Sequence, residues 1–323
     1  MKNNIIKLSQ KRSLCDWVRY IAALLIVNGH LFLFSNPESI LTPYMNLGAC
    51  CVSIFFFFSG YGLMTSYERK GDAYLNGFFR RRETKILFPF LMAYAITLPV
   101  YALLRGSIDW KTVLGTLSWG GPYLKFSWYV TEILILYGIF YMVMRTKCDI
   151  RKKRTGLTLS VLLFTTILVV TKQPNWYIIS LPVFIIGVWF QAYEKRLSLI
   201  LSQNKVLIAA GAIWFLTWQW HLFGQKILTA YRWQYLSYYI YNIAFVAMIV
   251  GVICKLRITP PDSKITHSSY EVYLMQNCAF IIVSALSMPF IGYWITAICT
   301  SALIGHVVHN LNAKLNSIIL LKS

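Results

Sequence analysis

Residues 48–66 have the sequence GACCVSIFFFFSGYGLMTS, nineteen residues without one charged side chain. A transmembrane helix needs about 20 mostly apolar residues to cross about 30 Å of hydrocarbon, so this stretch predicts a membrane span. Similar segments lie on both sides of it, and Lys172–Asn175 suits a tight hairpin between two of the shorter ones. The ten predicted spans are approximately 17–35, 48–66, 86–104, 127–144, 156–171, 176–192, 206–222, 235–254, 270–288 and 290–311.

The composition excludes several protein classes. Of the 323 residues, 57% are hydrophobic and 13% are charged, whereas a soluble domain carries about 25% charged residues. Ten prolines and 18 glycines without a biased tract exclude a disordered or collagen-like chain. The seven cysteines show neither metal-ligand spacing nor a disulfide framework, so we interpret them as apolar filler without redox chemistry.

The positive charge of the chain is distributed by side of the membrane. Its 31 Lys and Arg against 11 Asp and Glu give a net charge of +20, which in a polar chain would suggest nucleic acid as a partner. With the N-terminus inside, 24 of the basic residues fall in inner segments and six in outer loops, as the positive-inside rule requires. We therefore expect no nucleic-acid partner. The sequence predicts an all-α polytopic bundle, one domain over residues 1–323, in the plasma or inner membrane with both termini cytoplasmic.

A few ionisable side chains lie inside the predicted spans: Arg19, His30, Glu132, His306 and His309. Such groups are costly in hydrocarbon and usually face a cavity, which makes them functional candidates. Arg19 and His30 are eleven residues apart in one predicted helix, on the same face and about 16 Å apart along the axis. A long cytosolic ligand with phosphates at one end and a reactive group at the other, such as acyl-coenzyme A, matches that spacing. Asp16 lies three residues before Arg19, where it can orient the guanidinium.

Structural interpretations of these residues stay open at this point. A membrane histidine often only hydrogen-bonds to a neighbouring helix, and an arginine near a helix end often snorkels to the lipid headgroups. His306 and His309 share a helix face, but no Cys, Asp or Glu lies close in sequence to complete a metal site. We therefore predict no metal ion.

Two motifs occupy the first two predicted spans. Asp16-x-x-Arg19 is followed after ten residues by His30, and residues 55–61 have the sequence FFFFSGY. Three more motifs follow: RRRETK at 80–85 before Pro89, SWY at 127–129 and SYEVYL at 269–274. In their order, spacing and sidedness these motifs resemble the membrane-bound acyltransferase 3 family, and the resemblance covers nearly the whole chain.

The chain departs from the family pattern at two positions and in one larger feature. Lys85 stands at the last basic position of the R-x-x-R stretch, and Gln276 stands where family members often have a histidine. The chain also resembles the stand-alone type, without the extra hydrolase-like domain that many members carry. The resemblance implies O-acylation, most often acetylation, of a cell-envelope polysaccharide or its lipid-linked precursor.

Two residues are the candidates for a catalytic role. His30 is the expected general base, because a neutral imidazole can accept the proton of a hydroxyl that attacks an acyl thioester. Glu132 lies one turn beyond Trp128 and would orient His30 or the acceptor hydroxyl, unless it neutralises a basic group in the bundle.

The remaining candidates are binding residues. Arg19, Arg82 and Lys85 would hold the phosphates of acetyl-CoA, the expected acyl donor, with Arg80 and Arg81 able to share this role. Topology and anionic lipids also explain this basic cluster. Ser59 and Gly60 would let the thioester lie against the second span, or they simply allow close helix packing. Trp128 and Tyr61 are the candidates for the acceptor pocket, and Trp128 is also a possible interfacial anchor.

Other functions stay open on the sequence alone. A secondary transporter or glycan-lipid flippase could also have ten spans, although no internal repeat is present. Within the enzyme class, succinyl or another short acyl group is an alternative to acetyl, and transfer can be direct or pass through an acyl-enzyme. A non-catalytic assembly factor for polysaccharide export is a third class. The expected partners are acyl-CoA, a glycan or glycolipid acceptor and membrane lipids, and the oligomeric state is open.

Overall fold

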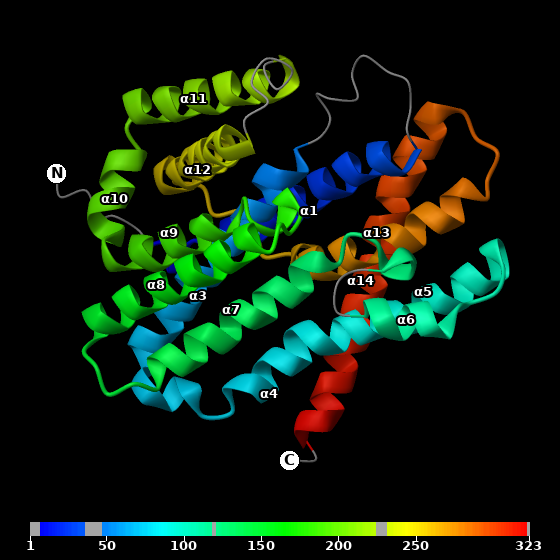
Figure 1. Cartoon of the computed structure of the whole chain (residues 1–323), viewed down its shortest axis with the longest axis horizontal. Coiled ribbons are helices and arrows are strands. Elements are labelled where there is room, and N and C mark those ends of the chain that lie inside the picture. The colour runs from blue at the N-terminus through cyan, green and yellow to red at the C-terminus, as the bar shows by residue number, and fades with distance from the viewer. Residues whose placement is uncertain (1–6, 36–46, 118–120, 224–230, 322–323) are drawn as a thin grey trace. The chain divides into compact units, whose positions relative to one another are not determined.

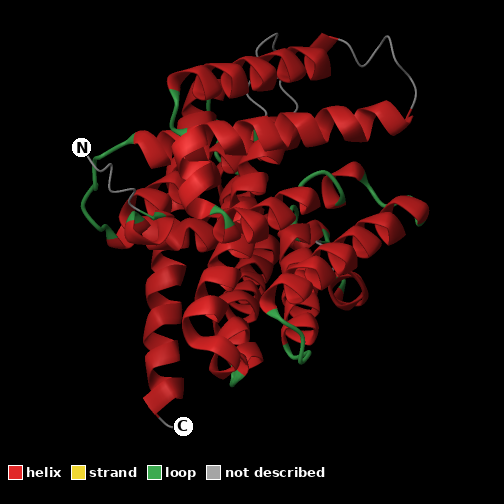
Figure 2. Ribbon diagram, turned by 90° about the vertical axis from the view of Figure 1, so that its left-hand side faces the viewer, coloured by secondary structure: helices red, strands yellow, loops and turns green. Residues whose placement is uncertain are grey.

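The computed structural model describes residues 7–35, 47–117, 121–223 and 231–321. These residues form helices joined by loops, and the described ranges contain no strand (Figures 1 and 2). Each of the ten predicted spans coincides with a helix. The all-α fold class predicted from the sequence is therefore confirmed.

Six helical segments in the described ranges are long and apolar enough to cross a membrane: Gly48–Leu75, Phe78–Arg105, Ile150–Val170, Asn175–Ala192, Tyr235–Lys255 and Phe290–Ser317. A seventh candidate joins α10 (Glu194–Leu201) to α11 (Asn204–Phe223), with a bend of 79° between the two. The apolar helix α7 (Trp128–Met144) has 17 residues and α13 (Ser269–Ser284) has 16, both short for a full crossing. The chain is a multi-pass helical membrane protein.

The chain divides into two compact units, and the first comprises residues 1–19, 49–76 and 138–262. It contains α10, α11 and nearly all of α3 (Gly48–Lys70). Its other helices are η2 (Gly71–Leu75), α8 (Ile150–Val170), η5 (Asn175–Tyr177), α9 (Leu181–Ala192) and α12 (Tyr231–Lys255). Helix α12 packs along α11 and contacts α10 and α9, and α8 packs on α9 (Figure 1). This unit also receives the first part of α1 (Arg12–Ser35) and the last part of α7.

The second unit comprises residues 20–48, 77–137 and 263–323. It contains α4 (Phe78–Arg82), the π-helix η3 (Glu83–Leu87), α5 (Phe88–Arg105), α6 (Trp110–Thr116), η4 (Pro122–Leu124), η7 (Lys264–Ser268), α13 and α14 (Phe290–Leu321). Helix α13 is its centre, because it packs on α14, α5, η4 and η7. Nearly all of α13 is buried.

Two glycines allow α3 and α9 to approach closely in the first unit. A Cβ atom on Gly60 would lie 2.2 Å from the carbonyl oxygen of Phe184, and one on Gly187 would lie 2.2 Å from that of Phe57. Real Cβ atoms do not come so close to backbone, so both positions require glycine. Small residues at helix crossings are a common means of packing in membranes. This contact favours the packing interpretation of Gly60 that the sequence had left open.

Pro89 explains the π-helical turn that precedes α5. Proline has no N–H, and inside an α-helix its ring clashes with the carbonyl four residues earlier, here that of Lys85. The chain avoids this by widening over Glu83–Leu87, where the Phe88 N–H donates to the Glu83 carbonyl. Such single-turn π segments often occur at functional sites. The segment carries two of the basic residues that the sequence marks as candidates, Lys85 within it and Arg82 directly before it.

The N-terminal segment of the first unit is fixed to the end of α12. The Lys11 ammonium donates to the carbonyls of Ile253, Cys254 and Leu256 at 2.8, 2.8 and 2.9 Å. These carbonyls lie in the last turn and just beyond it, where helical partners are lacking, so a lysine cap is favourable. Burial lowers the pKa of this amine.

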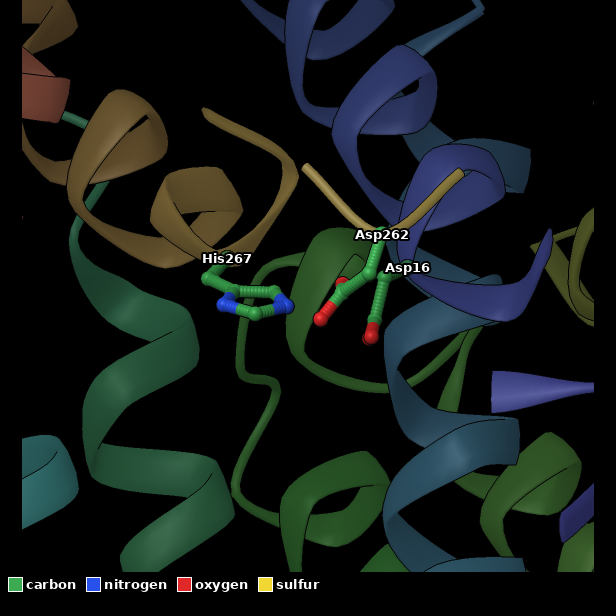
Figure 3. Close-up of side chains that lie close together, drawn as sticks. All are labelled: Asp16, Asp262 and His267. Atoms are coloured by element: carbon green, nitrogen blue, oxygen red, sulfur yellow. The ribbon is translucent and has the colours of Figure 1, made fainter. Parts of the chain in front are cut away.

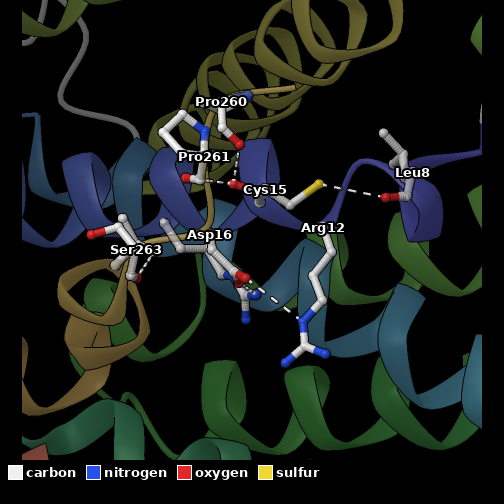
Figure 4. A network of polar contacts seen from close by, with 10 residues as sticks. Leu8, Arg12, Cys15, Asp16, Pro260, Pro261 and Ser263 are labelled. Carbon is white, nitrogen blue, oxygen red and sulfur yellow. Dashed lines mark hydrogen bonds and ion pairs between the residues drawn. The ribbon is translucent and has the colours of Figure 1, made fainter. Parts of the chain in front are cut away.

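A second set of contacts holds the start of α1 to the loop after α12 (Figure 4). The Ser13 hydroxyl donates to the carbonyls of Pro260 and Pro261, and the Trp17 indole N–H donates to Pro261. Cys15 lies on the opposite side, toward the Leu8 carbonyl. The first turns of α1 are therefore positioned by tertiary contacts on two sides.

The glycine crossing gives a direct test. We expect Gly60→Ala and Gly187→Ala each to destabilise the protein by about 1–3 kcal/mol, because backbone must move to admit the methyl group. Gly62→Ala in the same helix is the matched control, since a Cβ atom added there would meet no neighbouring atom within 4 Å, and alanine favours a helix. Thermal unfolding of the detergent-solubilised variants measures the difference. Equal melting temperatures for the three variants would contradict the crossing.

Candidate functional site

His30 lies in α1 and is held from two directions by other parts of the second unit. Its Nδ1 atom is 2.8 Å from the Oε1 atom of Gln276 on α13. The ring of Phe126 stacks on the imidazole with a centroid separation of 3.9 Å and an interplanar angle of 6°. Two residues earlier in α1, the Asn28 side chain accepts a hydrogen bond from the Trp294 indole at 2.7 Å. This part of α1 is thus fixed to both α13 and α14.

The contact with Gln276 determines which ring nitrogen of His30 is available. The amide oxygen can only accept, so Nδ1 carries the hydrogen and Nε2 keeps its lone pair. An imidazole in this tautomer can take a proton at Nε2 without losing the contact that orients it. His30 therefore has the arrangement that a general base requires.

Glu132 is a buried carboxylate without a hydrogen-bond partner in the described part of the chain. It lies on α7 with 1% of its surface exposed, and neither carboxylate oxygen has a partner there. An unpaired polar group of this kind costs free energy, and in native structures it often marks a functional position. Glu132 makes no hydrogen bond to His30, so the residue that orients the imidazole is Gln276.

Trp128 begins α7 directly after the segment that covers His30. It is half-buried, and the neighbouring Tyr129 packs its ring edge against Tyr273 of α13 at 5.9 Å. Trp128, Glu132 and His30 all belong to the second unit. The sequence placed His30 in a different span from Trp128 and Glu132, and the fold assigns all three to one compact part.

Arg82 and Lys85 occupy the end of α4 and the π-helix of the second unit. The Arg82 guanidinium lies over the rings of Tyr137 and Phe78, at 4.8 and 5.3 Å from their centroids. The Tyr270 hydroxyl donates to the Ile86 carbonyl at 3.0 Å and so fixes the π-helix to α13. Lys85 is exposed, as a residue that receives a soluble anion must be.

Arg19 and Asp16 belong to the first unit and pair with each other across one turn of α1. Arg12 lies on the other side of Asp16, with 3.7 Å between its Nε atom and the carboxylate (Figure 4). The Arg19 guanidinium lies 5.6 Å from the Phe58 ring centroid. Its Nε atom is buried and has no hydrogen-bond partner among the described residues. Asp16 therefore orients Arg19, while 36% of the Arg19 side chain stays exposed.

Asp262 is a residue that the sequence did not mark. Its carboxylate lies within 4.8 Å of that of Asp16 (Figure 3), although the two residues are far apart along the chain. No local motif could have indicated this pairing, because it depends on the loop after α12. The neighbouring Arg12 and Arg19 offset the negative charge that the two carboxylates bring together.

The second-span motif has a structural role in the first unit. Tyr61 is buried, and its hydroxyl donates to Glu194 Oε1 at 2.7 Å while it accepts from the Ser9 N–H at 3.1 Å. Glu194 also accepts from the Leu8 N–H at 2.7 Å. Ser59 is half-buried beside the helix crossing at Gly60. These contacts hold the N-terminal segment that leads to Asp16 and Arg19.

His309 has a carboxylate partner that the sequence analysis missed. Its Nδ1 atom is 3.0 Å from Glu271 Oε1, a residue on α13 that is 5% exposed at its side chain. His306, one turn earlier on α14, lies 3.1 Å from the Asn310 amide. Glu271 is 38 positions away in the sequence, so a search for nearby ligands could not find it.

The candidate residues divide between the two units. His30, Arg82, Lys85, Trp128 and Glu132 belong to the second unit, and Asp16, Arg19, Ser59, Gly60 and Tyr61 to the first. Helix α1 carries residues of both sets and is continuous from Arg12 to Ser35. The prediction that Arg19 and His30 lie in one helix is therefore confirmed.

Comparison with known proteins gives one match. A family model described as an acyltransferase domain matches residues 15–308 of the chain. No curated protein and no solved structure matches it. The matched region contains every candidate residue discussed above except His309, which lies one position beyond its end.

The unpartnered carboxylate gives a prediction about stability. We expect Glu132→Met to stabilise the protein by about 1–3 kcal/mol, because methionine has a similar length and leaves no buried polar group unpaired. Glu194→Met is the matched control and should destabilise by a similar amount, since two donors lose their acceptor. Thermal unfolding of both variants in one detergent measures the effect. A loss of stability in Glu132→Met as large as in the control would refute the assignment of Glu132 as an unpaired group.

Proposed function

The chain belongs to the acyltransferase 3 family of multi-pass membrane acyltransferases, and on that premise we propose that it is an O-acyltransferase of the cell envelope. It moves an acyl group, acetyl in the first instance, from cytosolic acyl-CoA to a hydroxyl of a polysaccharide or its lipid-linked precursor. The observation that carries the proposal is the orientation of His30, with Nδ1 at Gln276 Oε1 and Nε2 left to act. Family membership favours this enzyme over a transporter, a flippase or an assembly factor.

The chemistry assigns His30 the proton transfer. Its Nε2 atom removes the proton of the acceptor hydroxyl while the hydroxyl oxygen attacks the thioester carbonyl. A C–O bond forms, the C–S bond breaks, and the thiolate of coenzyme A leaves and takes up a proton. An acyl thioester is already activated, so positioning and base catalysis supply most of what the enzyme must add. Glu132 is assigned to the acceptor hydroxyl, because it does not contact His30.

The basic residues are assigned to the coenzyme. Arg19 binds a phosphate with the donors that Asp16 leaves unused, and Arg82 and Lys85 contribute from the π-helical segment. Arginine binds phosphate through paired N–H groups, whereas lysine supplies a compact charge. Ser59 is assigned to the coenzyme arm and Trp128 to the acceptor pocket. Tyr61 is assigned instead to the support of the N-terminal segment, because it is buried and hydrogen-bonded to Glu194. Gly60 serves the same site indirectly through the close packing of α3 on α9.

The proposed membrane topology of the chain follows from the distribution of its Lys and Arg residues. Ten spans place both termini in the cytoplasm of a plasma or inner membrane, as the bias of Lys and Arg toward inner segments favours. Acyl-CoA then enters from the cytoplasm at Arg19. The acceptor hydroxyl approaches His30 from the other side, because His30 is the outer of these two residues on α1.

The base is tested in cells. We expect His30→Ala to remove one acyl substituent from the surface glycans, because loss of a general base costs about 10²- to 10⁴-fold in rate. His306→Ala is the control. Its side chain contacts the Asn310 amide on the same helix, and the proposal gives it no role in the reaction. Mass spectrometry of glycans from cells with matched protein levels identifies the substituent. Its retention in the His30→Ala strain would refute the proposal.

The phosphate contact is tested with purified protein. Arg19→Ala should raise KM for acetyl-CoA about 10- to 100-fold with a small change in kcat, because a charge-assisted contact to the coenzyme is lost. Arg12→Ala is the control, because Arg12 also pairs with Asp16 but its side chain is 82% exposed. Steady-state kinetics of both variants measure KM and kcat. An equal effect in the two variants would show that only the pairing with Asp16 matters.

A further inference from the structure

Phe126 has a backbone conformation that is rare for a bulky residue. Among the described residues, two other than glycine have positive φ: Phe126 at 70° and Lys172 at 55°. Lys172 lies in the exposed turn after α8, where such a conformation is common. Phe126 is instead half-buried two residues before the start of α7, with its ring stacked on His30. A left-handed conformation costs an L-residue about 1–2 kcal/mol.

Two side chains on one face of α13 hold the segment in that conformation. The Tyr273 hydroxyl donates to the carbonyl of Phe126 itself. One turn further along α13, the Asn277 amide donates to the Tyr123 carbonyl at 2.9 Å. Asn277 and Tyr123 are almost fully buried. The strained loop is therefore over-determined by α13, as strain at functional sites usually is.

The same helix also holds His30 through Gln276. Tyr273, Gln276 and Asn277 lie within five consecutive residues of α13, and they fix, in that order, the Phe126 backbone, the His30 imidazole and the Tyr123 backbone. From this left-handed backbone conformation the Phe126 ring stacks on the imidazole. One face of His30 is covered by Phe126, and one edge is occupied by Gln276.

We propose that Phe126 is a positioning residue for His30, held in its left-handed conformation by Tyr273 so that its ring covers one face of the imidazole. The proposal rests on the proposed function, in which Nε2 of His30 takes up a proton. The stacked ring blocks rotation of the imidazole away from Gln276 and leaves Nε2 as the ring nitrogen open to substrate. An aromatic face also attracts the cationic imidazolium that forms when the proton arrives. An aliphatic side chain offers neither a flat cover nor this attraction.

Substitutions at Phe126 separate the ring from the backbone. We expect Phe126→Leu to lower kcat about tenfold with KM for acetyl-CoA unchanged, because an oriented base is loosened while the coenzyme contacts stay. Phe126→Tyr should restore most of kcat, since it keeps the ring. Phe126→Gly adopts φ of 70° without strain but has no ring, so its kcat should be as low as that of Phe126→Leu. Wild-type kcat in Phe126→Gly or Phe126→Leu would overturn the proposal.

The role of Tyr273 is tested by removal of one hydroxyl. Tyr273→Phe should lower kcat in the same direction as Phe126→Leu, without a change in KM. Tyr101→Phe is the control, because Tyr101 packs its ring on Tyr123 at 4.8 Å and no described residue hydrogen-bonds its hydroxyl. The control should behave as wild type. A loss in the control as large as in Tyr273→Phe would contradict a specific role for the Tyr273 hydroxyl.

A second readout does not require acyl transfer. Diethyl pyrocarbonate modifies neutral imidazole nitrogens, and peptide mass spectrometry reports the rate at each histidine. His30 should react several-fold faster in Phe126→Leu than in wild type, because one face of its ring is uncovered, while His309 reacts equally in both. An unchanged rate at His30 overturns the placement of Phe126. If wild type shows this protection but transfers no acyl group, the positioning stands and the proposed function fails.

Discussion

Hydrocarbon offers no water to a buried polar group, so hydrogen bonds inside a membrane bundle must come from the protein itself. The 2.8 Å contact between His30 and Gln276 is the clearest case here. It satisfies one ring nitrogen of a residue that would otherwise be costly to bury, and it fixes the tautomer at the same time. The contacts of α13 fit this requirement, because Tyr273 and Asn277 bind the segment before α7 and Gln276 binds His30 on α1. Several buried polar atoms in the described chain lack a hydrogen-bond partner, and Glu132 stands out because both of its carboxylate oxygens do.

In the first unit, buried polar groups find their hydrogen-bond partners around the N-terminal segment. Glu194 accepts hydrogen bonds from one backbone N–H and from Tyr61, and Lys11 caps the carbonyls at the end of α12. These contacts fix the start of α1, from which Arg19 projects. The candidate residues of the two units thus depend on different networks: that of the first unit includes the buried charged groups Glu194 and Lys11, and that of the second unit is built on neutral groups such as Gln276.

The fold class could be predicted from the sequence because the features that indicate a membrane helix are local. Apolar length and the bias of Lys and Arg act on each segment separately, and all ten predicted segments are helical. Six of them have the length and hydropathy of a span by a strict criterion, with a bent seventh candidate. The short α13 shows why the numbers differ: its 16 residues are almost entirely buried by other helices, so lipid does not set its length.

The partners of the candidate residues could not be predicted in this way, because they depend on tertiary contacts over long separations. Gln276 is 246 positions from His30, and the sequence identified it only as a departure from the family pattern. Phe126 lies directly before a recognised motif and carried no signal of its own, since a positive φ at phenylalanine contradicts local preference. Conversely, the motif at Gly60 and Tyr61 was visible in the sequence, but only the fold shows that both residues hold helices together.

Three of the side chains that make structural hydrogen bonds near His30 are amides rather than acids or bases. Gln276, Asn277 and Asn28 neither gain nor lose a proton at any pH at which the protein is folded. Asn242 makes the equivalent contact in the first unit, to the Ile179 carbonyl at 2.8 Å. A network of amides therefore keeps the same geometry whether His30 is neutral or protonated. A histidine at position 276 would share the proton with His30 and couple the two titrations. With glutamine there, proton uptake is confined to Nε2 of one residue, which is what a single general base in a low-dielectric site requires.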